Sequence, residues 1–580
     1  MDGVKEDVPG YFKQIYENLY NSVDDSEELC DVKQKVEDRI NISSLADVNR
    51  VTPDVIKQAA KNLNESKTDP NCIFNSDCIR NGTDGLFSSL SMAIKSFLIH
   101  GHITYFLLLA TLVPIIKDKL GSINSSKNYR SIAISSIILK LFDWVIIILF
   151  GVSIGVDDLQ FAYQPGVSGN MCTWTVIETV SYFLRNGSSV YCCMMNMTKA
   201  FDLVKHSLLF KKLLTAGLSV IFIRLLIFIY INQFANVRWN GQYSNIFSLT
   251  NGVRQGAVLS GFFYCFYMNG LFELLRRSGN GCWVKSVFFG ITGYSDDSLL
   301  IAPSLTALQE MLSICESYAE EHNLKFSTDK NPSKSKTKCL AFQRKPQDLP
   351  QLTLCGNQLP WVSSGKHLGN QIENRINGQK ADIKIKRAQY IGKNNELLQE
   401  FFFSHPKTKV HLNSIYNSHL TGSCLWDLFS PEAVMMENTW NTSIRLMYDL
   451  PRQTHRNLIE PISETNHIRF HLIKRFLSFI NQIENSPKQA SKHLLKTVKH
   501  DARSTSGSNL RNILLMTDKY DVDDLNPSDA RLIKYHPLND DETWKVNFIL
   551  EATDVKFEQL EVDGFQMEEI EEIIDYLCCS

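Results

Sequence analysis

The chain has 580 residues, of which 44% are hydrophobic and 11% aromatic, a content that excludes a disordered chain and allows three or four domains. The formal net charge of −2 is unevenly spread: residues 1–70 carry 9 Lys and Arg against 15 Asp and Glu, and residues 516–580 carry 5 against 18. The part between them is therefore basic, as expected of a protein that binds a nucleic-acid backbone, although scattered solvated lysines would give the same count.

The N-terminal region over residues 11–64 shows helical spacing of apolar residues, beginning with Tyr11 and Leu19. Thr52 followed by Pro53 is the pairing of cap and first-turn residue that begins a helix. We therefore expect helices before the central part of the chain.

Two blocks follow that place polar residues beside regular elements. Asn128-Tyr129-Arg130-Ser131-Ile132 comes after an apolar run that ends at Lys117. The strand-like run of residues 191–197 leads into Thr198-Lys199-Ala200-Phe201-Asp202, and residues 204–217 are predicted to form a helix.

A glycine-containing block comes next. Residues 251–260, Asn-Gly-Val-Arg-Gln-Gly-Ala-Val-Leu-Ser, place a cation, an amide and two glycines just before the apolar stretch of residues 262–271. Glycine lets the backbone approach a ligand closely, so this loop is a candidate binding loop.

The most informative block is Tyr294-Ser295-Asp296-Asp297, set between the apolar residues 287–291 and 299–302. These flanks predict two buried strands joined by a short turn, with both carboxylates at the tip. Adjacent carboxylates at one tip can hold the metal ions of a phosphoryl-transfer site, whereas a merely polar turn would show the same pattern. Both interpretations remain open on this block alone.

In this order the four blocks resemble those of reverse transcriptases of non-LTR retrotransposons (LINE-type, jockey-like), which read NYRPI, D-x-x-K-A-F-D, G-V-R-Q-G and Y-A-D-D. The resemblance continues through Leu324-Lys325-Phe326, residues 336–342 and Gly365-Lys366-His367-Leu368-Gly369, the last similar to the hairpin that grips a primer end. It covers residues 50–460, and the segment Leu450-Pro451-Arg452-Gln453-Thr454-His455-Arg456 belongs to its weaker end.

The resemblance implies an α+β right-hand polymerase fold, with fingers, a palm on an antiparallel sheet, a thumb, and helical N- and C-terminal extensions. We expect a helical segment over residues 1–98, fingers and palm over 99–345, and primer-grip hairpin and thumb over 346–460. A helical, acidic region is expected over residues 461–580.

Two finer expectations concern the C-terminal region. The lysines, serines, Pro487 and Gly507 of residues 486–508 predict a linker. The tail from Glu551 to Ser580, rich in Asp and Glu around Ile570, is predicted to form an acidic amphipathic helix.

The activity implied is RNA-directed DNA polymerisation, in which two divalent ions, magnesium or alternatively manganese, act on a primer 3′ end and a deoxynucleotide. The implied catalytic residues are Asp296, Asp297 and Asn196, and the implied metal ligands are these three and the Met197 carbonyl. The implied nucleotide-binding residues are Lys117, Arg130, Phe201, Gln255 and Gly256, with Phe201 as the aromatic gate against a ribose 2′ hydroxyl. The implied primer and template contacts are Arg254, Lys336, His367, Leu368 and Gly369.

One position departs from the family in a way that bears on chemistry. Asn196 stands where the family's first block begins with an aspartate, and an amide supplies one oxygen ligand but no charge. We expect metal occupancy to fall and the rate to drop on the order of a thousandfold. The alternative function is therefore a nucleic-acid-binding protein derived from a reverse transcriptase and impaired in catalysis.

Hydropathy raises a membrane protein as a rival. The apolar residues 132–156 contain Lys140 and Asp143, and the apolar residues 218–231 contain Arg224, so we expect buried helices and no membrane partner.

The cysteines bear on the cellular location of the protein. The fourteen cysteines show no zinc-ligand spacing and are expected to be reduced thiols. We expect a nuclear or cytoplasmic protein that is not secreted. Its expected partners are an RNA template, a DNA primer and deoxynucleoside triphosphates, with an endonuclease on a separate polypeptide because no endonuclease segment is recognised here.

Overall fold

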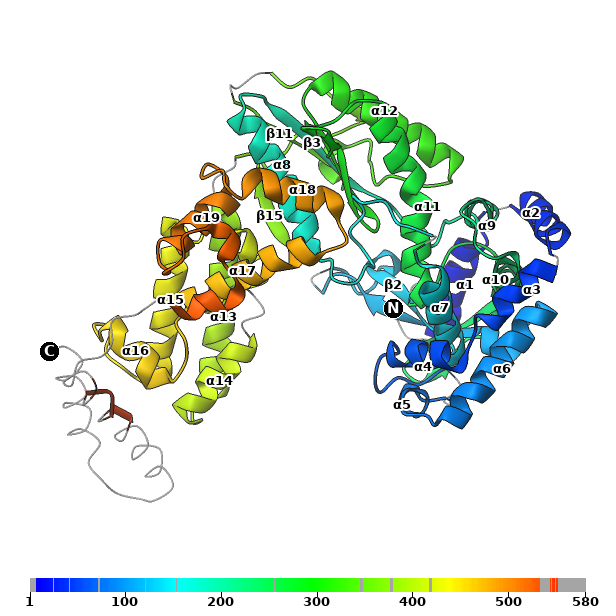
Figure 1. Ribbon diagram of the computed structural model, residues 1–580, viewed down its shortest axis with the longest axis horizontal. Coiled ribbons are helices and arrows are strands. Elements are labelled where there is room, and N and C mark those ends of the chain that lie inside the picture. Colours follow the sequence, from blue (N-terminus) through cyan, green and yellow to red (C-terminus); the bar gives the residue numbers. More distant parts are fainter. Residues whose placement is uncertain are drawn as a thin grey trace, which may run out of the picture.

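The structure is a computed structural model that describes residues 7–23, 25–40, 42–70, 74–119, 121–152, 154–254, 256–344, 348–375, 379–416, 420–532, 543, 545–547 and 549–550. Figure 1 shows a palm with an arm on either side. One arm holds the N-terminal helices and the fingers, and the other holds the thumb and the C-terminal helices. This is the right-hand α+β arrangement that the resemblance implies.

Among the described residues, six α-helices precede the first strand. They are α1 (Val8–Tyr20), α2 (Ser26–Asp38), α3 (Ile42–Asn49), α4 (Pro53–Lys61), α5 (Ser76–Arg80) and α6 (Asp84–His100). The helical N-terminus is thus confirmed, and the Thr52 hydroxyl accepts a hydrogen bond from the Val55 amide at the start of α4. Phe12 of α1 packs against the rings of Tyr129 and Trp239 in the fingers sheet.

The fingers sheet has the strand order β2-β1-β4-β5, with β6 also paired to β4. Its strands are β1 (Leu109–Ile116), β2 (Tyr129–Ile134), β4 (Gln233–Trp239), β5 (Gln242–Tyr243) and β6 (Phe247–Leu249). β1 runs parallel to β4, and the other pairs are antiparallel. Between these strands along the chain lie the apolar helices α7 (Ile137–Phe150) and α10 (Val220–Ile231).

The palm sheet is antiparallel throughout, with the order β11-β3-β10-β9. Its strands are β3 (Val190–Asn196), β9 (Ile291–Tyr294), β10 (Asp297–Ala302) and β11 (Lys338–Phe342). The helices of this part are α8 (Gly169–Arg185), α9 (His206–Thr215), α11 (Val258–Arg277) and α12 (Leu305–Glu321). Side chains of β10 alternate: Leu299 and Ile301 share a core with Val176 and Val180 of α8, whereas Leu300 belongs to the main core with α12.

Both edges of the palm sheet carry a further parallel bridge. Gln160 bridges to Gly293 of β9, and Trp361 bridges to Cys339 of β11. The strand expected over residues 287–291 is divided, because β8 (Val287–Phe288) pairs with β7 (Trp283–Val284) and β9 begins only at Ile291.

Two short hairpins follow the palm sheet along the chain. The first, β12 (Thr353–Leu354) with β13 (Asn357–Gln358), packs against α12, and the second, β14 (Ser364–His367) with β15 (Asn370–Glu373), contacts both β11 and α13. Among the described residues, the second arm contains the helices α13 (Lys380–Glu400), α14 (Pro406–Tyr416), α15 (Pro431–Met447), α16 (Arg456–Ser463), α17 (Ile468–Asn485), α18 (Gln489–Val498) and α19 (Thr505–Leu514).

The linker predicted over residues 486–508 is wrong. This segment contains α18 and the first turn of α19, and Ser491 and Ser504 within it are fully buried. Lys488, Ser491 and Ser504 make hydrogen bonds inside the protein, so composition alone misled the prediction. The predicted acidic helix over residues 551–580 lies outside the described residues.

Within the described residues, α11 is the one helix long and apolar enough to span a membrane, with a mean hydropathy of 1.3. Of its most apolar 18 residues, 67% are buried inside the protein, as in a core helix. The apolar runs noted in the sequence form α7 and α10, which are shorter.

Asp143, one of the charges inside the apolar run, caps α11 from a neighbouring helix. Its carboxylate accepts hydrogen bonds from the amides of Val258 and Leu259, at 3.1 and 3.3 Å. Ala257 at the start of α11 has no capping side chain of its own. Burial raises the pKa of Asp143 to about 7, and the amides and Arg254 partly offset that rise.

The loop before α11 depends on glycine. Gly252 has φ +81°, and a Cβ there would lie 2.6 Å from the carbonyl oxygen of Asp202. Gly256 has φ +117°, and a Cβ there would overlap the carbonyl of Ala133 in β2. The loop therefore packs backbone against backbone on both fingers and palm, and the approach to a ligand expected from its glycines stays a prediction.

Replacing Asp143 with asparagine should make stability less dependent on pH. The pKa of this carboxyl is raised from 3.8 to about 7 in the fold, so the unfolded chain loses the proton first and stability falls as pH rises through this window. Between pH 5 and pH 8 we expect the unchanged protein to lose about 2 kcal/mol of unfolding free energy relative to Asp143→Asn. Urea titrations of both proteins at the two pH values measure the unfolding free energy. Equal pH dependence in the unchanged protein and in Asp143→Asn would contradict the expectation.

Gly252→Ala should destabilise the protein by about 2 kcal/mol or more, because the new Cβ meets backbone that cannot move independently. Gly241→Ala is the matched control, since Gly241 has φ +80° but no atom within 4 Å of an added Cβ. Thermal unfolding of both variants should show the larger loss at Gly252. Equal losses would mean that backbone conformation alone sets the cost.

Candidate active site

The Asp-Asp block forms the predicted hairpin tip. Tyr294 of β9 and Asp297 of β10 are the last paired residues, so Ser295 and Asp296 form a two-residue turn. Ser295 has φ +62°, the value that a type II′ hairpin turn requires at its first central position. A side chain at that position is uncommon, and its backbone must be held by its surroundings.

Asn196 lies directly opposite Asp297 in the pairing of β3 with β10. Its side-chain nitrogen donates to Asp297 Oδ1 at 3.4 Å. Burial raises the pKa values of Asp296 and Asp297, and the charge of Asp296 raises that of Asp297 further. The structure thus brings together the three predicted catalytic residues, with an amide in contact with a carboxylate whose ionisation is already disfavoured.

Met197, the fourth predicted ligand, follows Asn196 at the end of β3. An isolated bridge joins Met197 to Phe326. Its hydrogen bonds come from the neighbouring residues, the Asn196 carbonyl and the Thr198 amide, so the bridge uses neither the amide nor the carbonyl of Met197. The side chain is buried, and the Tyr264 hydroxyl lies 3.0 Å from its sulfur.

Cations from the fingers and the palm face the turn. Lys117 follows β1, and exposed Arg130 lies on β2, where its charge lowers the pKa values of both turn aspartates. Burial lowers the pKa of Lys117, and the nearby charges of Arg130 and Lys336 lower it further. Lys117, Arg130 and Lys336 are therefore close enough for their charges to interact, and of the three Arg130 also acts on the two carboxylates.

Phe201 is half-buried in an aromatic group beside the turn. Its ring stacks on Tyr264 at a centroid distance of 4.8 Å and meets Tyr163 edge-on at 6.4 Å. The adjacent Asp202 is buried, which raises its pKa to about 6, and it faces Lys199 and Lys117. Asp202 thus belongs to the contact between fingers and palm and does not lie in the pairing of β3 with β10.

The 251–260 block contributes its residues unequally. Arg254 is only 7% exposed, and the charge of Asp143 lies close to it. Gly256 is the point at which the loop meets β2, and Gln255 lies outside the described residues. The buried position of Arg254 suits support of the loop, so a direct contact with primer or template remains a prediction without geometric support.

The predicted primer-grip residues form the β14–β15 hairpin. His367 pairs with Asn370, and Leu368 and Gly369 both have positive φ, the geometry of a type I′ turn. Leu368 and the Tyr294 ring both lie within 4 Å of a Cβ built at Gly169. This places the β14–β15 turn beside the Asp-Asp hairpin.

His367 itself points inward. It is 6% exposed, its Nδ1 lies 2.9 Å from the Thr173 hydroxyl of α8, and burial lowers its pKa to about 4. Lys386 of α13 donates to the Gly369 carbonyl from beneath the turn. Lys366 and Gly369 are exposed on this hairpin, whereas His367 holds the hairpin on α8.

Gln160 is the functional position that the sequence did not reveal. Its side chain is fully buried, its Oε1 accepts from the Ser295 amide at 2.9 Å, and its Nε2 donates to the Ser295 carbonyl at 3.4 Å. No sequence signal marks it, because both partners are backbone groups 135 residues away.

The donor set fits divalent ions only in part. Among the described residues, no group of three or more His, Cys, Asp and Glu side chains could hold a metal. Asp296 and Asp297 offer two carboxylates, and Asn196 offers an uncharged oxygen in the third place. Two close dications need more negative charge than this to offset their repulsion.

Residues 116–371 match the family described as reverse transcriptase (RNA-dependent DNA polymerase). The chain is 28% identical over 186 residues to the retrovirus-related Pol polyprotein from type-1 retrotransposable element R2 of Bradysia coprophila, covering 32% of this chain and 21% of that protein. It is 23% identical over 205 residues to the Pol polyprotein of element R2DM of Drosophila melanogaster, covering 35% and 19%. It is 25% identical over 217 residues to the 149 kDa protein of transposon TX1 of Xenopus laevis, covering 37% and 17%.

Solved structures similar to the chain include two telomerases. That of Candida albicans, solved with a fragment of telomeric RNA, shows 12% identity and a TM-score of 0.31, covering 68% of this chain and 64% of that one. The apo telomerase of Candida tropicalis, truncated from its C-terminal domain, shows 12% identity and a TM-score of 0.30, covering 53% and 63%.

The chain spans about one fifth of the length of the curated relatives it matches. The residues that match the family, 116–371, contain the palm sheet with its Asp-Asp hairpin and the fingers strands β2, β4, β5 and β6. By the family match and by the similarity to the R2 and TX1 proteins, residues 116–371 are a reverse transcriptase domain of the non-LTR retrotransposon kind.

Proposed function

We propose that this chain is an RNA-directed DNA polymerase that adds deoxynucleotides to the 3′ end of a DNA primer on an RNA template. The observation that carries the proposal is the position of Asp296 and Asp297 at a hairpin tip, within the field of Arg130 and beside the β14–β15 turn. A primer end on the β14–β15 turn would lie next to the carboxylates.

Reverse transcriptases as a family use divalent metal ions, and Asp296 and Asp297 are the residues that would hold them here, with Asn196 and the Met197 carbonyl as weaker ligands. Bound magnesium, or manganese in its place, would supply the positive charge that stabilises the attacking and leaving oxygens. Metal binding would depend on the protonation states of Asp296 and Asp297. Both carboxylates must be ionised to bind metal, and burial disfavours that state for each of them.

The protein's own cations would hold the triphosphate. Lys117 and Arg130 come from the fingers and Lys336 from the palm, and charge-assisted hydrogen bonds from such groups orient phosphates. Phe201 would restrict the sugar, because its ring is fixed between Tyr264 and Tyr163 and cannot turn away from a 2′ hydroxyl. Gln255 and Gly256 would line the floor beneath the nucleotide.

Asn196 favours a second candidate function, nucleic-acid binding with impaired catalysis. The missing carboxylate removes one negative charge from the metal site, and the Asn196 amide instead donates to Asp297. The basic central part of the chain would still attract a template and primer. We further propose a nuclear or cytoplasmic location, and a separate endonuclease as the source of the primer end.

Asn196→Asp should raise the rate of primer extension on an RNA template by about a thousandfold, because it restores a charged metal ligand opposite Asp297. Steady-state extension with magnesium and deoxynucleotides measures the effect. Asp297→Asn is the matched control, since it removes a carboxylate across the same pair of strands and should abolish extension in either background.

The outcome separates the two candidate functions. Extension by the unchanged protein identifies a working polymerase, and extension only by Asn196→Asp identifies the impaired form. If Asn196→Asp binds primer and template but extends nothing, the assignment of this position is wrong.

Phe201→Ala in the Asn196→Asp protein should weaken discrimination against ribonucleotides by about tenfold or more, because it removes the ring from beneath the sugar. The measured quantity is the ratio of kcat/KM for dCTP to that for CTP. Tyr163→Phe, which keeps the aromatic contact with Phe201, is the control and should leave the ratio unchanged.

A further inference from the structure

Residues 157–161 lie along the free edge of β9 and connect the catalytic hairpin to the C-terminal helices. The Phe161 amide donates to the Gly293 carbonyl at 2.8 Å, and the Gly293 amide donates to the Leu159 carbonyl at 2.9 Å. Arg276 of α11 binds both carboxylate oxygens of Asp157. The segment is therefore fixed to the palm along its length.

From this segment, Gln160 reaches the turn itself. Its two hydrogen bonds take up the amide and the carbonyl of Ser295, the residue with φ +62° that precedes Asp296. A backbone conformation that a serine rarely adopts persists where its surroundings over-determine it. The Gln160 amide is the group that does so here.

On its other side the segment is held by the start of α18. Lys488 is 2% exposed, and its Nζ donates to the carbonyls of Gln160 and Asp157 at 2.6 and 3.0 Å. The Asp158 carboxylate accepts from the amides of Gln489 and Ala490, the first two residues of the helix. Each partner thus satisfies buried polar groups of the other.

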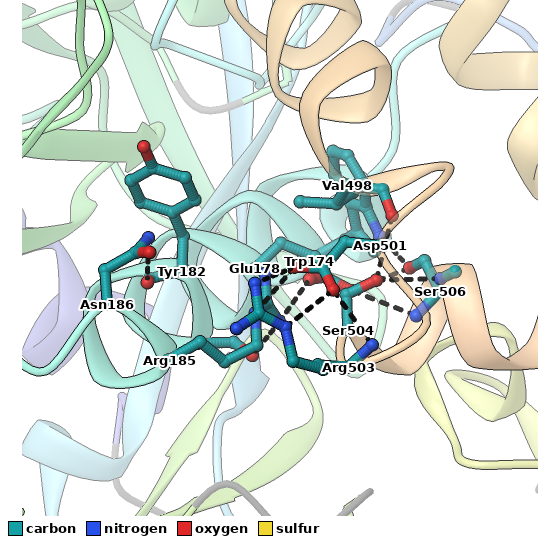
Figure 2. A network of polar contacts seen from close by, with 12 residues as sticks. Trp174, Glu178, Tyr182, Arg185, Asn186, Val498, Asp501, Arg503, Ser504 and Ser506 are labelled. Carbon is teal, nitrogen blue, oxygen red and sulfur yellow. Dashed lines mark hydrogen bonds and ion pairs between the residues drawn. The ribbon is translucent and has the colours of Figure 1, made fainter.

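A second contact anchors the same helices to the palm. In Figure 2, Arg185 at the end of α8 lies between Glu178 and Asp501, and Ser506 of α19 points toward Glu178. Ser506 donates to Glu178 through both its amide and its hydroxyl, at 3.1 and 2.7 Å, and accepts from the Trp174 indole. Because these groups are buried, separating α19 from α8 would leave charges without partners.

We infer that α18 holds the catalytic turn in place through Lys488 and Gln160, which act as positioning residues for the polymerase reaction. The inference rests on the proposed function. The order of contacts is α18 to Lys488, Lys488 to the Gln160 carbonyl, the Gln160 side chain to Ser295, and Ser295 to Asp296. The C-terminal helices are by this route part of the catalytic module.

The test compares Lys488→Met, Gln160→Met and the double variant, each in the unchanged and the Asn196→Asp protein. Both single variants should lower kcat for primer extension by about ten- to a hundredfold and leave the KM for deoxynucleotide and the Kd for primer and template within about twofold. The double variant should lose no more than the larger single loss, because both act on one path. Lys488→Arg should recover part of the rate.

Lys496→Met is the matched control, since Lys496 lies on the same helix but is exposed. This substitution should leave kcat, the KM for deoxynucleotide and the Kd for primer and template unchanged. Unchanged kcat in both single variants, or losses that add in the double variant, would overturn the inference. Gln160→Met still tests the path if Lys488→Met does not fold. This substitution removes the bonds to Ser295 but keeps the Gln160 backbone carbonyl that Lys488 binds.

Amide hydrogen exchange of the peptide over residues 293–297 tests the inference without catalysis. Exchange at Ser295 should quicken in Lys488→Met and in Gln160→Met but not in Lys496→Met. If no form of the protein extends a primer while exchange responds as expected, the polymerase proposal fails and the positioning path stands. Unaltered exchange in both variants would overturn the path itself.

Discussion

The pairing of β3 with β10 fixes the relative positions of the groups at the site. Its register sets Asn196 opposite Asp297, and the two-residue turn then determines where Asp296 lies. A shift by one residue would turn every side chain of β10 to the opposite face, and the cores on both faces of the palm sheet prevent it. The relative positions of the site residues therefore depend on one cross-strand pair, in which an amide lies opposite a carboxylate.

In both turns at the site, a residue other than glycine adopts a backbone conformation that favours glycine. Ser295 in the catalytic turn and Leu368 in the primer-grip turn have positive φ, and each is held by a buried side chain from elsewhere in the chain. Gln160 bonds the first turn, and Lys386 bonds the second through the Gly369 carbonyl. The two loops that would meet a primer end are thus ordered before any ligand arrives, which lowers the entropic cost of alignment.

The sequence predicted those features that depend on local pattern. The Asp-Asp turn and the Thr52 cap each follow from residues close together in the chain, and the structure confirms both. Prediction from the sequence failed where contacts between residues far apart in the chain determine the structure. Residues 486–508 look like a linker by composition, but Lys488 and Ser506 are bonded to residues more than 300 positions away. The burial of His367 was likewise hidden, because its partner Thr173 lies on another element.

The bridges at both edges of the palm sheet also bear on how copies of the chain behave toward one another. An unpaired strand edge can pair with the edge of another molecule and so seed aggregation. Here the backbone of residues 159–161 covers β9, and residues 360–362 cover β11. The palm sheet is therefore protected against growth by strand addition, and the C-terminal helices, through Lys488, help to keep the first of these segments in place.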